Sequence, residues 1–73
     1  MMLKYALYAK GIGFSDGVGG WDMNINTAYL MENKHAAEIY RVQMNLRKNV
    51  PLDDLQVITI RVEEMRKIVD LLS

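Results

Sequence analysis

The sequence predicts an α+β fold: a small antiparallel sheet of about three strands, packed against one main helix, with a second helix appended at the C-terminus. Residues 33–48 repeat apolar side chains at helical spacing, residues 55–62 are rich in β-branched side chains, and all five glycines fall within residues 11–20. A chain of 73 residues forms a single domain, residues 1–73, which buries only about 60% of its unfolded surface. We therefore expect dimerisation to add stability.

The N-terminal third predicts a hairpin. Residues 3–10 form the first strand, and because neither of its faces is strongly polar, we expect it to be central in the sheet. The sequence Ser15-Asp16-Gly17 predicts the turn, and the glycines around it favour a second strand that is bulged. The polar residues 22–27 predict a turn or a single helical turn, and residues 28–31 a short extended segment.

Residues 33–48 predict the main helix. Asn33 is a favoured N-cap type, and Arg47 and Lys48 suit the negative end of the helix dipole. Asn49 and Pro51 are expected to close the helix. The expected core face lies in one narrow arc flanked by Ile39 and Leu46, and consists of Ala36, Ala37, Tyr40 and Met44. The opposite side is expected to be an ordinary solvated surface, made of Glu38, Arg41 and Asn45.

The C-terminal third predicts a strand and a helix. In the strand Leu55–Val62 the expected core side is Gln56, Ile58, Ile60 and Val62, and we expect Ile58 to be buried under the main helix. In the helix Glu63–Leu72 four apolar residues are spaced i, i+3, i+4, i+7, namely Met65, Ile68, Val69 and Leu72. This stripe predicts self-association into a homodimer, although packing on the chain's own sheet would also account for it.

Composition narrows the function classes. Nine basic and nine acidic residues cancel and are dispersed along the chain. A domain that binds nucleic acid mainly through phosphates usually has a basic excess on one face, and a DNA mimic needs an acidic excess, so the charge favours neither class. The absence of cysteine excludes disulfides and thiolate metal sites. No apolar run approaches the ~20 residues of a membrane span, and the N-terminal MMLKYALYAK lacks the apolar core of a signal peptide. We therefore expect a soluble cytoplasmic protein.

The order of elements resembles that of many small proteins encoded by bacteriophages. The features that carry the resemblance are a hairpin strand, Trp21, a polar stretch, Ala28, Met31, the N-capped helix with Ala37 and a closing β-strand, which together cover residues 4–62. The resemblance implies an accessory factor that binds a bacterial host protein in the host cytoplasm and inhibits or redirects it. This chain departs from the pattern in its extra C-terminal helix and in Met31, where an aromatic residue is more usual. The resemblance consists of spacing, so it assigns no functional residue.

No catalytic, cofactor or metal site is predicted. The glycines begin as Gly11-Ile12-Gly13 but lack the third glycine of a dinucleotide-binding motif, and no Lys-Ser or Lys-Thr pair follows for a phosphate loop. His35 is the only histidine and is expected to face solvent. The paired carboxylates Asp53-Asp54 and Glu63-Glu64 are typical of solvated or helix-start positions. We therefore expect a protein that is not an enzyme.

The aromatic residues predict a binding surface on the hairpin. Six aromatic side chains are too many for a core of this size, so some are expected to be exposed, where they commonly anchor protein interfaces. The expected partner-binding residues are Tyr8, Phe14, Asp16 and Trp21. Filling of the core by Trp21 and Tyr40 is the competing interpretation. An alternative function is a nucleic-acid-binding or regulatory domain that uses Tyr8, Phe14 and Trp21 as a stacking surface.

Overall fold

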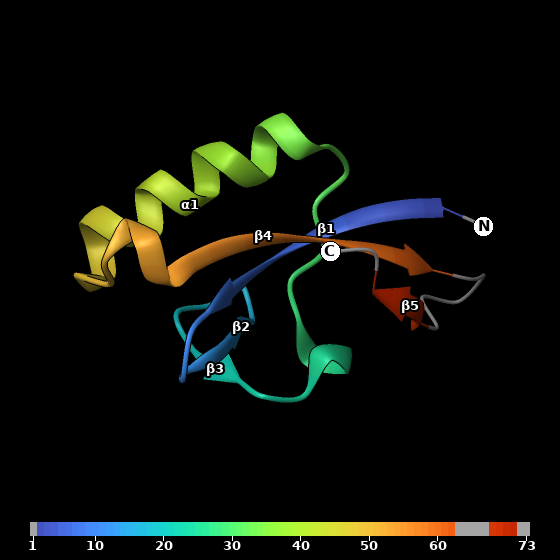
Figure 1. The fold of residues 1–73 in the computed structure, drawn as a ribbon, viewed down its shortest axis with the longest axis horizontal. Coiled ribbons are helices and arrows are strands. Elements are labelled where there is room, and N and C mark those ends of the chain that lie inside the picture. The colour runs from blue at the N-terminus through green and yellow to red at the C-terminus, as the bar shows by residue number, and fades with distance from the viewer. Residues whose placement is uncertain (1, 63–67, 72–73) are drawn as a thin grey trace.

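The computed structural model describes residues 2–62 and 68–71, and it confirms an α+β class with an antiparallel sheet and one main helix (Figure 1). In that part of the chain the strands are β1 (Met2–Ala9), β2 (Gly13–Ser15), β3 (Trp21–Asp22), β4 (Leu55–Val62) and β5 (Ile68–Leu71). The helix α1 spans Lys34–Lys48, and the two 3₁₀ turns are η1 (Ile25–Thr27) and η2 (Leu52–Asp54). The strands lie in the order β3-β2-β1-β4-β5, so the predicted number of about three is too low.

The sheet is built on one long antiparallel pair. Strands β1 and β4 pair along their whole length, from Met2 opposite Val62 to Ala9 opposite Leu55, and β1 is central as predicted. The predicted turn at Ser15-Asp16-Gly17 connects β2 to β3, while a separate turn at residues 10–12 connects β1 to β2. Gly13 has a φ of 129°, and a Cβ there would lie 2.6 Å from the Asp22 backbone. Only glycine allows this close approach of β2 and β3.

The caps of α1 are those that the sequence predicts. The Asn33 side chain accepts a 2.7 Å hydrogen bond from the Ala36 N–H, and Asn49 ends the helix in the left-handed conformation with a φ of 57°. Ala37 and Met44 are buried against Leu7 and other apolar residues of the sheet. Ala36 is exposed, so its predicted place in the core face is wrong.

The two faces of the sheet are covered by different segments (Figure 1). The helix α1 covers the face that carries Leu7 and Leu55. The Ile58 side of β4 faces the other way and packs against the segment of residues 25–30 that follows β3. Ile58 is therefore buried as predicted, with 8% of its surface exposed, but not under α1. Gln56, which was predicted to lie on the same core side, is exposed, so that part of the prediction is wrong. The sequence predicted a single core face on the sheet. The segment of residues 25–30 forms a second layer that shields the other face from water.

The predicted C-terminal helix is wrong where the structure describes it. Residues Ile68–Leu71 form β5, which pairs with β4 in antiparallel register and has a bulge at Arg61 and Val62. Without β5, β4 would present an open edge of unpaired backbone groups, and β-branched Ile68 and Val69 suit a strand. The predicted helical stripe for self-association is therefore wrong at Ile68 and Val69, which belong to a strand. Its other two members, Met65 and Leu72, lie outside the described residues.

Candidate protein-binding surface

The hairpin does not expose the aromatic surface that the sequence predicts. Phe14 is only 9% exposed and packs against Tyr8, with ring centroids 4.9 Å apart, on the face of the sheet opposite α1. Trp21 is partly buried on the α1 side, against the cluster that contains Leu7 and Met44. The expectation that Phe14 is exposed is therefore wrong, and Phe14 and Trp21 face opposite sides. A partner-binding role for these residues stays a prediction.

Asp16 has a local role that its geometry explains. Its Oδ1 accepts 2.9 Å hydrogen bonds from the backbone N–H groups of Val18 and Gly20, and these bonds close the loop between β2 and β3. The N–H of Val18 and then that of Gly20 hold the pKa of the Asp16 carboxyl below its ordinary value. The side chain that was predicted to bind a partner thus shapes the loop.

The hairpin is tied to α1 through a buried polar contact. The hydroxyl groups of Ser15 and Tyr40 lie 2.6 Å apart and form a hydrogen bond, and Ser15 is fully buried. Tyr29 packs edge-on against Tyr40, with ring centroids 5.5 Å apart. Tyr40 and Trp21 are partly buried against the core, which agrees with the competing interpretation that they fill it. The aromatic residues of this region therefore anchor the hairpin under the helix.

The helix α1 carries an apolar stripe on its solvent side. Ile39 and Val42 are each 48% exposed and Leu46 is 73% exposed. At about 100° per residue these three, together with exposed His35, fall in one arc opposite the buried residues Ala37 and Met44. We call the set His35, Ile39, Val42 and Leu46 the outer stripe. A shallow groove of about 380 Å³ lies along its first part, bordered by Glu38 and Gln43.

The sequence prediction missed the outer stripe because it placed Ile39 and Leu46 beside the core face, and the structure shows that placement to be wrong. It also assigned the polar residues of α1 to solvent. Arg41 instead turns toward the chain, where its Nε donates to the Leu55 carbonyl at 2.8 Å and its Nη2 to the Leu52 carbonyl at 2.7 Å. The Asn45 amide likewise donates to the Val50 carbonyl at 2.8 Å. These polar contacts hold this side of the helix against the chain between Val50 and Leu55, while Ala37 and Met44 hold the neighbouring side against the sheet. Spacing of Ile39, Val42 and Leu46 at i, i+3 and i+7 was the available signal for a second apolar face.

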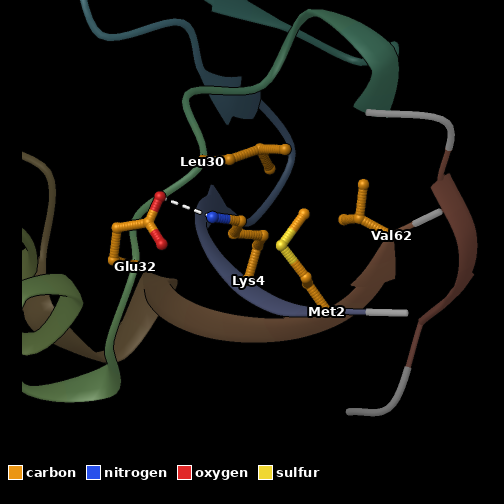
Figure 2. A pocket seen from close by; sticks show the side chains of 5 residues that line it. All are labelled: Met2, Lys4, Leu30, Glu32 and Val62. Carbon is orange, nitrogen blue, oxygen red and sulfur yellow. Dashed lines mark hydrogen bonds and ion pairs between the residues drawn. The ribbon is translucent and has the colours of Figure 1, made fainter. Parts of the chain in front are cut away.

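A small pocket lies at the N-terminal end of β1, between this strand and the segment that leads into α1. Figure 2 shows Lys4 reaching from β1 toward Glu32, with Leu30, Met2 and Val62 around it. The pocket has a volume of about 160 Å³. The Lys4 side chain is only 14% exposed and its Nζ pairs with the Glu32 carboxylate, which is 80% exposed. Together with the backbone bridge between Tyr5 and Met31, this ion pair fastens the segment before α1 to β1.

Within residues 2–62 and 68–71, no three His, Asp or Glu side chains are grouped so that they could hold a metal ion. Over those ranges, no helix has the length and apolar character needed to cross a membrane. Comparison of the chain with known protein families, with curated proteins and with solved structures finds no match. The candidate surface therefore depends on the geometry of this chain alone.

Proposed function

We propose that this protein is a small protein-binding module whose contact surface is the outer stripe of α1. The observation that supports the proposal is the exposure of Ile39, Val42 and Leu46 together on the side of α1 that faces away from the core. A helix that only covers a sheet carries polar residues there, and contiguous exposed apolar residues commonly mark an interaction site. Glu38 and Gln43 supply the polar border that such a site has at its rim.

The size of the stripe limits the affinity that it can supply. Complete burial of an exposed Ile, Val or Leu side chain contributes about 1.5–3 kcal/mol, so the three partly exposed side chains contribute roughly 4 kcal/mol in total. Association itself costs about 4–15 kcal/mol in lost freedom of motion. The outer stripe would then be the apolar centre of a contact whose tight binding depends on further polar contacts around it.

For the partner, we propose a bacterial host protein that the chain inhibits or redirects in the host cytoplasm. The support for this choice is the order of elements that resembles small phage-encoded proteins. Burial of Phe14 weakens the alternative of nucleic-acid stacking on the hairpin, and the net charge of zero supplies no excess of cations for phosphates.

Two variants with the same substitution distinguish the outer stripe from the hairpin. Val42→Glu places a carboxylate in the outer stripe, while Val18→Glu places one at the tip of the loop between β2 and β3, where Val18 is 88% exposed. Both sites are exposed and Glu suits a helix, so both variants should keep the circular dichroism spectrum of the unmodified chain. Each purified protein is used to capture partners from a bacterial lysate.

We expect Val42→Glu to lose the captured partner and Val18→Glu to retain it. The opposite result would assign the binding surface to the hairpin, as the sequence predicted. A partner that binds both variants as well as the unmodified chain would show that neither surface is used. Failure of the unmodified chain to capture any protein would contradict the proposed function itself.

A further inference from the structure

We infer that the outer stripe also pairs two copies of this chain in a weak dimer, with the two α1 helices antiparallel about a two-fold axis that passes between positions 40 and 41. The inference uses the surface of the proposed function but requires no other protein. The observation that carries it is the order of the residues along the stripe, which complements itself when the helix is reversed. A second copy is therefore the occupant that the sequence of the stripe fits.

The spacing along the outer stripe reads the same in both directions. His35, Ile39, Val42 and Leu46 are separated by four, three and four residues. A two-fold axis at the centre of this series places Ile39 opposite Val42 of the second copy and His35 opposite Leu46. Alternation of three and four residues is the spacing by which helices pack along a shared seam, and a two-fold contact requires a surface that matches itself.

The charges around the stripe agree with pairing to a second copy. No member of the stripe is an acid, a lysine or an arginine, and the charged residue that borders its groove is Glu38. The same axis places Glu38 opposite Gln43 of the second copy, whose amide can donate a hydrogen bond to a carboxylate. The chain has a formal net charge of zero, so two copies do not repel each other over long range.

The area available makes this dimer weak. A stable interface buries about 800 Å² on each partner, and three partly exposed aliphatic side chains with their polar border fall short of that area. The dimer should therefore form at high protein concentration and dissociate on dilution. Because it covers Ile39 and Val42, it also hides the surface proposed for partner binding, so the dimer and the partner should compete.

Disulfide trapping tests the antiparallel arrangement directly. The chain has no cysteine, so Ile39→Cys and Val42→Cys each introduce a single thiol. The two variants are mixed in equal amounts and oxidised, and the products are separated by mass, since the variants differ by one methylene group. Random collision gives about half mixed disulfide, and the antiparallel dimer raises the mixed product well above that fraction. A mixed fraction at or below one half would overturn the arrangement.

Sedimentation equilibrium tests the dimer without any cross-link. The unmodified chain should show a monomer–dimer equilibrium, and Val42→Glu should raise its dissociation constant by about 100-fold, because a tenfold loss at each site counts twice across the two-fold axis. Val18→Glu should leave the equilibrium unchanged. An unmodified chain that stays monomeric at about 1 mM, or equal dimerisation by Val42→Glu, would overturn the inference.

These purified samples contain no partner, so the two proposals fail separately. A chain that stays monomeric but captures a partner through Val42 overturns only the dimer. A chain that dimerises through Val42 but captures nothing overturns only the proposed function.

Discussion

Replacement of Arg41 by alanine is the sharpest test of how α1 is oriented. Its guanidinium donates two hydrogen bonds to backbone carbonyl groups, one at Leu52 in the connection between α1 and β4 and one at Leu55, the first residue of β4. It also lies 3.9 Å from the Glu38 carboxylate, an exposed pair that contributes little. Arg41→Ala removes both backbone contacts together. The sequence alone had placed this residue on a solvated surface, where the substitution would have no effect on stability.

The structure sets the size of the expected loss. A hydrogen bond from a charged donor contributes about 1.5–3 kcal/mol, so two would give roughly 3–6 kcal/mol. The Arg41 side chain is 27% exposed, and water can replace part of what the Leu52 carbonyl loses. We therefore expect the free energy of unfolding to fall by about 2–4 kcal/mol. For a domain of this size that corresponds to a melting temperature lower by roughly 10–25 °C.

Urea unfolding followed by far-UV circular dichroism measures this loss. Arg47→Ala is the matched control, because Arg47 is an exposed arginine on the same helix and its loss should cost only about 0.5 kcal/mol through the helix dipole. Arg41→Lys should lie between the two, since one ammonium group cannot reproduce the planar fork that reaches both carbonyl groups. Equal midpoints for Arg41→Ala and Arg47→Ala would refute the proposed role of Arg41.

Two further substitutions test other parts of the fold. Ile58→Ala should lower the free energy of unfolding by about 2–5 kcal/mol, because it opens a cavity on the sheet face opposite α1. Gln56 on the same strand is exposed, so Gln56→Ala should change the free energy of unfolding little. Equal melting temperatures for the two variants would contradict this prediction. The backbone N–H groups of Val18 and Gly20 lower the pKa of Asp16 in the folded chain from its ordinary value of 3.8. The Asp16 carboxylate therefore stabilises the fold above pH 3.8, and this stabilisation is lost as the pH falls through the lower pKa of the folded state. Asp16→Asn should therefore flatten the acid limb of stability against pH, and an unchanged acid limb would show that Asp16 is not the group that titrates.

The parts of the fold that follow from local rules were predictable. Asn33 as a cap, the extent of α1 and the strand Leu55–Val62 depend on residue types and periodicity within a few turns. The C-terminal strand β5 was not predictable, because Ile68 and Val69 fit a helical stripe as well as a strand and only the open edge of β4 decides between them. Local preference loses there to pairing with a distant segment.

The candidate site was harder to predict for a related reason. Exposure of Phe14 was inferred from its place near a glycine-rich turn, but the burial of that side chain depends on contact with Tyr8 and with the segment after β3. The outer stripe requires knowing which side of α1 meets the sheet. Packing of Ala37 and Met44 against the sheet fixes that side, and Arg41 and Asn45 support it through hydrogen bonds to carbonyl groups up to 14 residues away in the chain. Residue type gives no indication of such partners.

The arrangement of α1 also bears on why its outer side is apolar. If stability alone governed the sequence, the solvent side of α1 would carry polar residues, since exposed Ile39, Val42 and Leu46 add nothing to the core and favour aggregation. In a domain this small every buried aliphatic side chain matters, yet these three lie outside while the polar side chain of Arg41 lies partly inside. Positions that break a stability rule without a compensating contact within the fold are expected at functional sites. The exposure of the outer stripe within the described residues 2–62 and 68–71 fits that description, so we propose that a contact with another protein surface supplies the compensation.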